Sequence, residues 1–218
     1  MAIRAVARGK LGADEDRWSY TETSRGLDDK RVTVVRVDPS RPEAERCMLL
    51  KIDGKLPTAA EVRRWRDEGR DSSAALGELP PLAQIVDLGD VRVAAIERTA
   101  TVFELPLRGG SFPSGKFQAR FRVNNTHRGF EDFSVKLRES VGVATGVKVT
   151  DAGLEARFQT LDPAHPPQPV LLKAGGAVRV LLLVKFGRTF EATRSDFRRV
   201  DPHREEAEAP VAPPHPTR

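Results

Sequence analysis

The stretch Phe117-Gln-Ala-Arg-Phe-Arg-Val123 decides the fold class, because apolar and polar residues alternate along it without a break. Successive side chains of a β-strand point to opposite faces, so this stretch predicts a strand with one apolar and one charged face. The same alternation returns in residues 91–95, 133–138 and 154–158, and residues 178–186 form the longest apolar strand expected. Repeated strands of this kind predict a continuous, strongly curved antiparallel sheet.

The N-terminal part of the chain adds three shorter strands. We expect them at residues 18–21, 31–37 and 48–52, with a turn at 24–26 between the first two. Two prolines within residues 38–42 interrupt regular pairing before the third strand. Asp53-Gly54 follows that strand as a hairpin-type turn pair.

Helices are predicted in only two places, both between strands. Thr58-Ala-Ala-Glu61 is a capping box, which predicts a helix that carries Val62 and Trp65 on one face and ends at Gly69. A second short helix is expected near Leu82–Val86. Neither helix is long enough to be stable alone, so we expect both to pack on the sheet.

Composition favours a packed domain with uneven charge. The chain has 218 residues, 39% of them hydrophobic, with 36 Lys and Arg against 31 Asp and Glu. Residues 108–200 hold sixteen Lys and Arg against eight Asp and Glu, a net charge of +8. This asymmetry suggests an acidic partner, such as a membrane surface, nucleic acid or an acidic protein. The alternative is that basic residues simply cover the outward faces of strands.

Few features of the sequence point to catalysis or to a bound metal. Residues 110–117 nearly match a phosphate-binding loop, but Phe117 stands where Ser or Thr must hold magnesium, and a strand follows instead of a helix. The four histidines lack metal-ligand spacing, and no serine lies on a strand-to-helix elbow. Cys47 favours a half-buried structural role. We therefore expect no enzyme activity, no cofactor and no metal.

A nucleic-acid interface is also poorly supported. It would depend on Arg120, Arg122, Lys136 and Arg138, but the neighbouring phenylalanines fall on the opposite strand face. Stacking platforms need aromatic rings and cations on the same exposed face. These four basic residues remain candidates for contact with an acidic membrane surface.

Three early segments resemble a group of envelope proteins of proteobacteria, and the later strands with the ending at residues 195–200 resemble the related LolA, LolB and RseB-like superfamily. The resemblance lies in residues 18–21, 37–40, 49–58 and 195–200, and it covers roughly residues 15–200 as a pattern. It implies an α+β, mainly antiparallel β domain, a half-open β-barrel with short helices on its concave face. It also implies a non-enzymatic, periplasmic protein that carries lipids or lipoproteins or senses envelope components.

Two features depart from that pattern. Cys47 stands where the related group has tryptophan, and the N-terminal residues Met1–Arg8 lack the apolar segment of an export signal. The chain is then either cytoplasmic or given from near its mature N-terminus. We expect a flexible segment at 1–12, a single domain at 13–200 and a disordered tail rich in Pro, Ala and Glu at 201–218.

The sequence hypothesis is an apolar concavity that holds a lipid or a lipoprotein acyl chain. The helix with Val62 and Trp65 would cover the cavity as a lid. The inward residues expected to line it are Phe121, Val123, Phe133, Val135, Leu137, Phe158, Leu182, Val184 and Phe186. Two alternatives stay open: the same residues form an ordinary filled core, or the protein is a docking or sensing module without lipid cargo.

Overall fold

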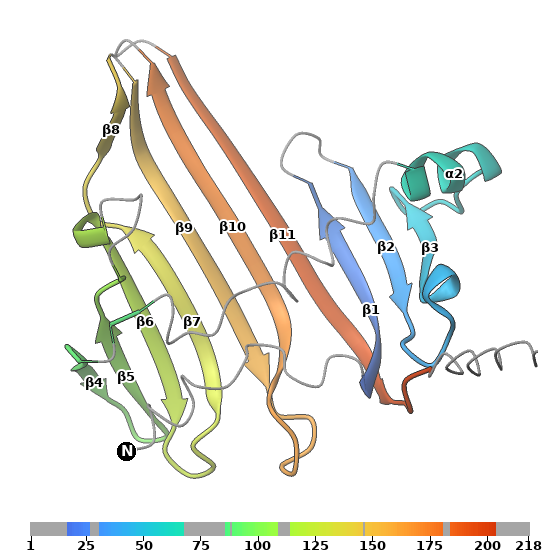
Figure 1. The fold of residues 1–218 in the computed structure, drawn as a ribbon, viewed down its shortest axis with the longest axis horizontal. Helices are drawn as coiled ribbons and strands as arrows, with labels where there is room; N and C mark the ends of the chain where they lie inside the picture. Colours follow the sequence, from blue (N-terminus) through green and yellow to red (C-terminus); the bar gives the residue numbers. More distant parts are fainter. Residues whose placement is uncertain are drawn as a thin grey trace, which may run out of the picture.

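A computed structural model describes residues 17–26, 31–67, 86–87, 89–108, 114–145, 147–180 and 184–203. The side chains of residues 114, 143, 178–180 and 184–188 lie outside this description. Strands dominate the fold, and α2 is the α-helix of the described residues (Figure 1). In chain order the elements are β1 (Trp18–Arg25), β2 (Val32–Val37), the 3-10 turn η2 (Glu43–Glu45), β3 (Cys47–Ile52), α2 (Ala59–Asp67), β4 (Arg92–Ile96), β5 (Ala100–Leu105), the 3-10 turn η3 (Ser114–Lys116), β6 (Phe117–Asn124), β7 (Phe130–Leu137), β8 (Val141–Ala144), β9 (Val147–Gln159), β10 (Gln168–Val180) and β11 (Val184–Arg199).

The eleven strands of the described residues belong to one antiparallel sheet. Its order is β3-β2-β1-β11-β10-β9-β7-β6-β5-β4, and β8 pairs separately with β9. The pairing of β1 with β11 joins residues that are far apart in sequence, such as Trp18 and Arg199. The sheet is open, with β3 and β4 at its two ends, and β9, β10 and β11 are its longest strands (Figure 1). The predicted antiparallel sheet is therefore confirmed.

Cross-strand pairing separates the two faces of the sheet along its whole width. Residues directly opposite each other in antiparallel strands project from the same face. One row of such pairs defines what we call the apolar face: Val93, Phe103, Phe121, Phe133, Ala156, Leu172, Ala192, Ser24, Thr33 and Ile52. The adjacent row defines the charged face: Arg92, Glu104, Arg120, Ser134, Glu155, Lys173, Glu191 and Arg25.

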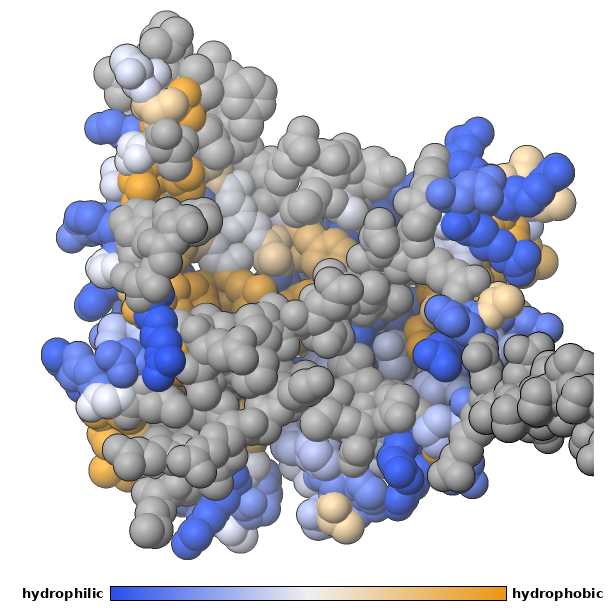
Figure 2. Space-filling view, viewed as in Figure 1, coloured by the Kyte–Doolittle hydropathy of each residue, from blue (hydrophilic) through white to orange (hydrophobic). Residues whose placement is uncertain are grey.

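Two hydrophobic clusters lie on the apolar face. The first cluster extends over β5, β6, β7, β9 and β10 and includes Val86, which is fully buried and forms an isolated bridge with Leu107. The second cluster lies at the β1–β3 end and consists of Tyr20, Val35, Val37, Leu49 and Ile52, with α2 packed against it. Figure 2 shows hydrophobic residues gathered over the middle of this face and hydrophilic residues toward its edges.

Two local predictions are confirmed in detail. Asp53 and Gly54 both have positive φ, as a two-residue hairpin turn requires, and Ile52 pairs with Lys55 across the turn. In the capping box, the Glu61 amide donates to Thr58 Oγ1 (3.3 Å), and the Thr58 amide donates to Glu61 Oε2 (2.8 Å).

Among the described residues, no helix is long and apolar enough to cross a bilayer.

Other predictions were wrong or fall outside the described residues. Residues 178–186 are not one strand: β10 ends at Val180, β11 begins at Val184, and Val178 pairs with Phe186. The sequence did not show that the chain reverses here, because the paired ends of β10 and β11 are both apolar. The turn expected at 24–26 is also wrong, since β1 continues to Arg25. Apart from Val86, the second predicted helix lies outside the description.

Candidate functional site

Four of the predicted cavity residues are buried together in the first cluster. Phe121 and Phe133 are each 2% exposed, and their rings stack with centroids 4.7 Å apart. Val123 and Phe158 belong to the same cluster, in which the Phe158 ring lies 6.3 Å from that of Phe130. These contacts are those of a packed hydrophobic core.

The structure does not bring the helix residues to that cluster. Val62 and Trp65 are half-buried and pack against the second cluster, over β1, β2 and β3. The sheet order places β11, β10, β9 and β7 between β1 and the strand that carries Phe121. The set of residues predicted as one site is thus divided between two places on the apolar face.

Beside the first cluster, the apolar face carries a row of side chains that are only half-buried. Val135, Leu154 and Phe190 pack against the cluster, and Leu137 follows Val135 on β7. Val135 is directly opposite Leu154, and Ala174 is opposite both Leu154 and Phe190. We call Val135, Leu137, Leu154 and Phe190 the apolar ledge.

Two of the remaining predicted cavity residues, Val184 and Phe186, lie at the start of β11. Backbone pairing sets Val184 opposite Val180 and Phe186 opposite Val178. Their side chains, and the whole of Leu182, lie outside the described residues.

A buried ion pair interrupts the apolar face between the two clusters. Glu22 and Arg194 are directly opposite each other, and each side chain is 2% exposed. Arg194 Nε donates to Glu22 Oε2 (3.1 Å), and the guanidinium lies 4.4 Å from the centre of the Tyr20 ring. The sequence contained one clue, because Trp18, Tyr20, Glu22 and Ser24 share a strand face. The partner of Glu22 is Arg194, which is 172 residues away in the sequence and could not be identified from that pattern.

Three of the four predicted basic contact residues have acidic neighbours on the charged face. Arg120 and Arg138 both pair with Glu104, at 3.6 and 3.9 Å. Arg122 pairs with Glu97 and donates through Nε to Glu131 (2.8 Å). Lys136 is exposed and has no ion-pair partner within the described part of the chain. The basic residues therefore belong to a surface of mixed charge.

Two consecutive carboxyl groups on β7 have pKa values shifted in opposite directions. Burial raises the pKa of Asp132, and the nearby Arg157 only partly opposes this. For Glu131, burial also acts to raise the pKa, but hydrogen bonds from Asn124 and Arg122 outweigh it and lower the value. The described residues contain no group of three or more His, Cys, Asp or Glu that could hold a metal ion.

Comparison with known proteins gave no match. No family model fits the chain, and neither the curated proteins nor the solved structures contain one that is significantly similar. We therefore infer a function from the geometry of the two faces.

Proposed function

We propose that this protein is a non-enzymatic binding protein that holds a lipid or lipoprotein acyl chain against the apolar ledge. The observation that supports this proposal is the half-buried state of Val135, Leu137, Leu154 and Phe190 beside a fully buried cluster. These side chains retain apolar surface that a ligand can remove from water. An acyl chain gains about 0.8 kcal/mol for each methylene that it buries.

The family resemblance supplies the finer parts of this proposal. It includes a half-open barrel curvature, short helices on the concave side and a place in the bacterial envelope. The described helix α2 covers the second cluster, so Val62 and Trp65 would border the ligand site rather than close it.

The direct test is native mass spectrometry and lipid extraction of the purified protein, followed by titration with a fluorescent fatty acid. Leu154 and Glu155 are adjacent on β9 but belong to opposite faces, so Leu154→Ser and Glu155→Ser form a matched pair. We expect Leu154→Ser to weaken fatty-acid binding about tenfold, because it removes apolar contact area, and Glu155→Ser to leave it unchanged. Thermal melts of both variants check that each one folds.

Absence of co-purifying lipid together with no saturable fatty-acid binding would contradict the proposal. Equal losses in the two variants would contradict it as well, because the ligand would then not distinguish the faces.

A docking or sensing module without lipid cargo is the second candidate. Acidic and basic residues alternate along the row that defines the charged face, which favours this candidate, since such a row can match a partner of complementary charge. Reversal of Arg120 and Arg122 to glutamate should abolish a low-salt complex with such a partner. Binding of the same partner by this double variant would exclude the charged face as its docking surface.

A further inference from the structure

The charged face contains a hollow where two glycines are neighbours. Lys136 on β7 is opposite Gly153 on β9, Gly153 is opposite Gly175 on β10, and Gly175 is opposite Thr189 on β11. In the next row, Glu155, Lys173 and Glu191 all carry long side chains. Neighbouring strands are about 4.8 Å apart, so two adjacent glycines leave a gap about 10 Å wide in the layer of side chains.

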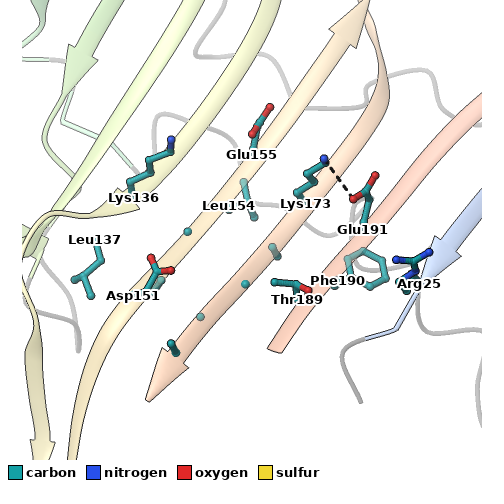
Figure 3. Close-up of a pocket in the computed structure, with 16 residues that line it drawn as sticks. Arg25, Lys136, Leu137, Asp151, Leu154, Glu155, Lys173, Thr189, Phe190 and Glu191 are labelled. Atoms are coloured by element: carbon teal, nitrogen blue, oxygen red, sulfur yellow. Dashed lines mark ion pairs between the residues drawn. The ribbon is translucent and has the colours of Figure 1, made fainter. Parts of the chain in front are cut away.

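Charged groups of both signs surround this hollow, which has a volume of about 720 Å³. Figure 3 shows Lys136 and Asp151 on one side of it, Lys173 and Glu191 along its margin, and Arg25 at the far end. Gly153 and Gly175 form its floor. We call this feature the glycine-floored hollow.

Three of the six charged residues that line the hollow, Glu155, Lys173 and Glu191, have ion-pair partners among the described residues. Lys173 Nζ lies 3.3 Å from Glu191 Oε2, and Arg157 Nη2 lies 3.1 Å from Glu155 Oε1. Lys136, Asp151 and Arg25 make no ion pair with any residue that the structure describes, and of these three Lys136 and Asp151 flank Gly153 on the floor of the hollow.

These two groups stand close together without pairing. Asp151 is two residues from Gly153, the residue opposite Lys136, so their backbones are diagonal neighbours about 7 Å apart. A cation and an anion held beside one hollow can each bind the opposite charge of a single ligand.

We propose that the glycine-floored hollow binds a small zwitterion that carries an ammonium group and a carboxylate, either a free amino acid or a short peptide. The ligand carboxylate accepts hydrogen bonds from Lys136 Nζ, and its ammonium donates to the Asp151 carboxylate. The absence of side chains on Gly153 and Gly175 lets the ligand lie against the strand backbone. Lys136 and Asp151 belong to the charged face, opposite the apolar ledge, so the proposed charged contacts are separate from the acyl-chain contacts, although Leu137, Leu154 and Phe190 of the ledge also line the hollow.

The test is a titration of the full chain followed by ¹H–¹⁵N NMR, with the Gly153 and Gly175 amides as reporters. The probes are 6-aminohexanoate, 4-aminobutyrate and glycine, which place the two charges at decreasing separations. Butyrate and butylamine each lack one charge, and we expect them to bind about tenfold more weakly than 4-aminobutyrate. Triglycine separates the two sources, because it carries the same terminal charges on a peptide.

Substitutions then locate the ligand. Lys136→Gln and Asp151→Asn should each weaken zwitterion binding about tenfold, because each removes one charge-assisted hydrogen bond. Arg25→Gln removes a cation from the far end of the same hollow, away from Lys136 and Asp151, and should weaken binding less than Lys136→Gln does.

Alanine substitution of two glycines provides a matched control for backbone strain. A Cβ on Gly153 would lie 3.2 Å from the Val135 carbonyl oxygen and enter the hollow. A Cβ on Gly176 would lie 3.1 Å from the Asp151 carbonyl oxygen but face the apolar side, toward Ala152. We expect Gly153→Ala to abolish zwitterion binding and Gly176→Ala to retain it at equal thermal stability.

Three results would overturn the proposal. The first is no saturable shift of either glycine amide with any zwitterion, including triglycine. The second is equal affinity for the half-charged probes, which would indicate nonspecific ion association. The third is equal binding by the Gly153→Ala and Gly176→Ala variants, which would place the ligand elsewhere.

Discussion

The two faces of this sheet use the same strands for different purposes. On β6, Phe121 is 2% exposed within the first cluster, whereas the adjacent Arg120 projects from the other face, where its side chain is 56% exposed. Burial of a large apolar side chain contributes about 1.5–3 kcal/mol, and an exposed ion pair contributes about 0–1 kcal/mol. The apolar face should therefore set the stability of the fold, and the charged face should set which molecules approach it.

The largest expected effect is at the centre of the first cluster. Phe121→Ala should lower the free energy of unfolding by about 3–5 kcal/mol, because it removes the ring stacked on Phe133 and leaves a cavity. Urea denaturation measures this change. Arg120→Ala is the control and should change stability by less than about 0.5 kcal/mol. Similar losses in the two variants would break the distinction between the faces.

The next effect concerns the charged pair on the apolar face. Glu22→Gln should destabilise the protein by about 3–5 kcal/mol, because it removes the carboxylate that Arg194 Nε contacts in a buried ion pair. The double variant Glu22→Gln with Arg194→Met should recover part of that loss, which a double-mutant cycle quantifies. If Glu22→Gln costs no more than an exposed substitution, the pair is not buried as described.

A smaller, pH-dependent effect distinguishes the two neighbouring acids of β7. The lowered pKa of Glu131 means that its ionised form stabilises the fold above its usual pKa, and that this contribution is lost as the pH falls through the lowered value. Glu131→Gln should therefore cost about 1 kcal/mol at pH 7 and progressively less under acid conditions.

Asp132 should show the opposite sign, since its pKa is raised by burial. Its ionised form is disfavoured in the fold, so Asp132→Asn should stabilise the protein at pH 7, with the gain disappearing as the pH falls below the raised pKa. Denaturant midpoints measured across this range test both signs. Destabilisation by Asp132→Asn at pH 7 would mean that its contact with Arg157 outweighs burial.

The sequence predicted which side chains share a face of the sheet better than it predicted where each strand begins and ends. Alternation in residues 117–123 and 133–137 assigned both faces of β6 and β7 correctly, because their apolar side chains never change sides. Most of β11 was not predicted from the sequence, and the reason is physical. The positions of β11 on the apolar face include Arg194 beside Phe190 and Ala192. In the sequence, a buried arginine looks like a residue of the charged face until its partner is known.

The candidate site was only partly predictable, because local pattern does not specify where an element docks. The capping box fixed the start of α2, and its apolar pair Val62 and Trp65 predicted contact with the sheet. Which part of the sheet they contact depends on the strand order, in which β11 joins β1 to β10. The glycine-floored hollow depends in the same way on cross-strand register, which sets Gly153 opposite Gly175.

The smallest expected effect tests the energetic claim for the charged face directly. Lys173 and Glu191 are opposite each other at 3.3 Å, with side chains that are 47% and 50% exposed. A double-mutant cycle with alanine should give a coupling energy of about 0.2–1 kcal/mol, because water screens the pair and both side chains lose conformational freedom. In 1 M salt the screening length falls to about 3 Å, so the coupling should nearly vanish. A coupling that is large and insensitive to salt would mean that this row stabilises the sheet itself, and the charged face would then share the structural role assigned to the apolar face.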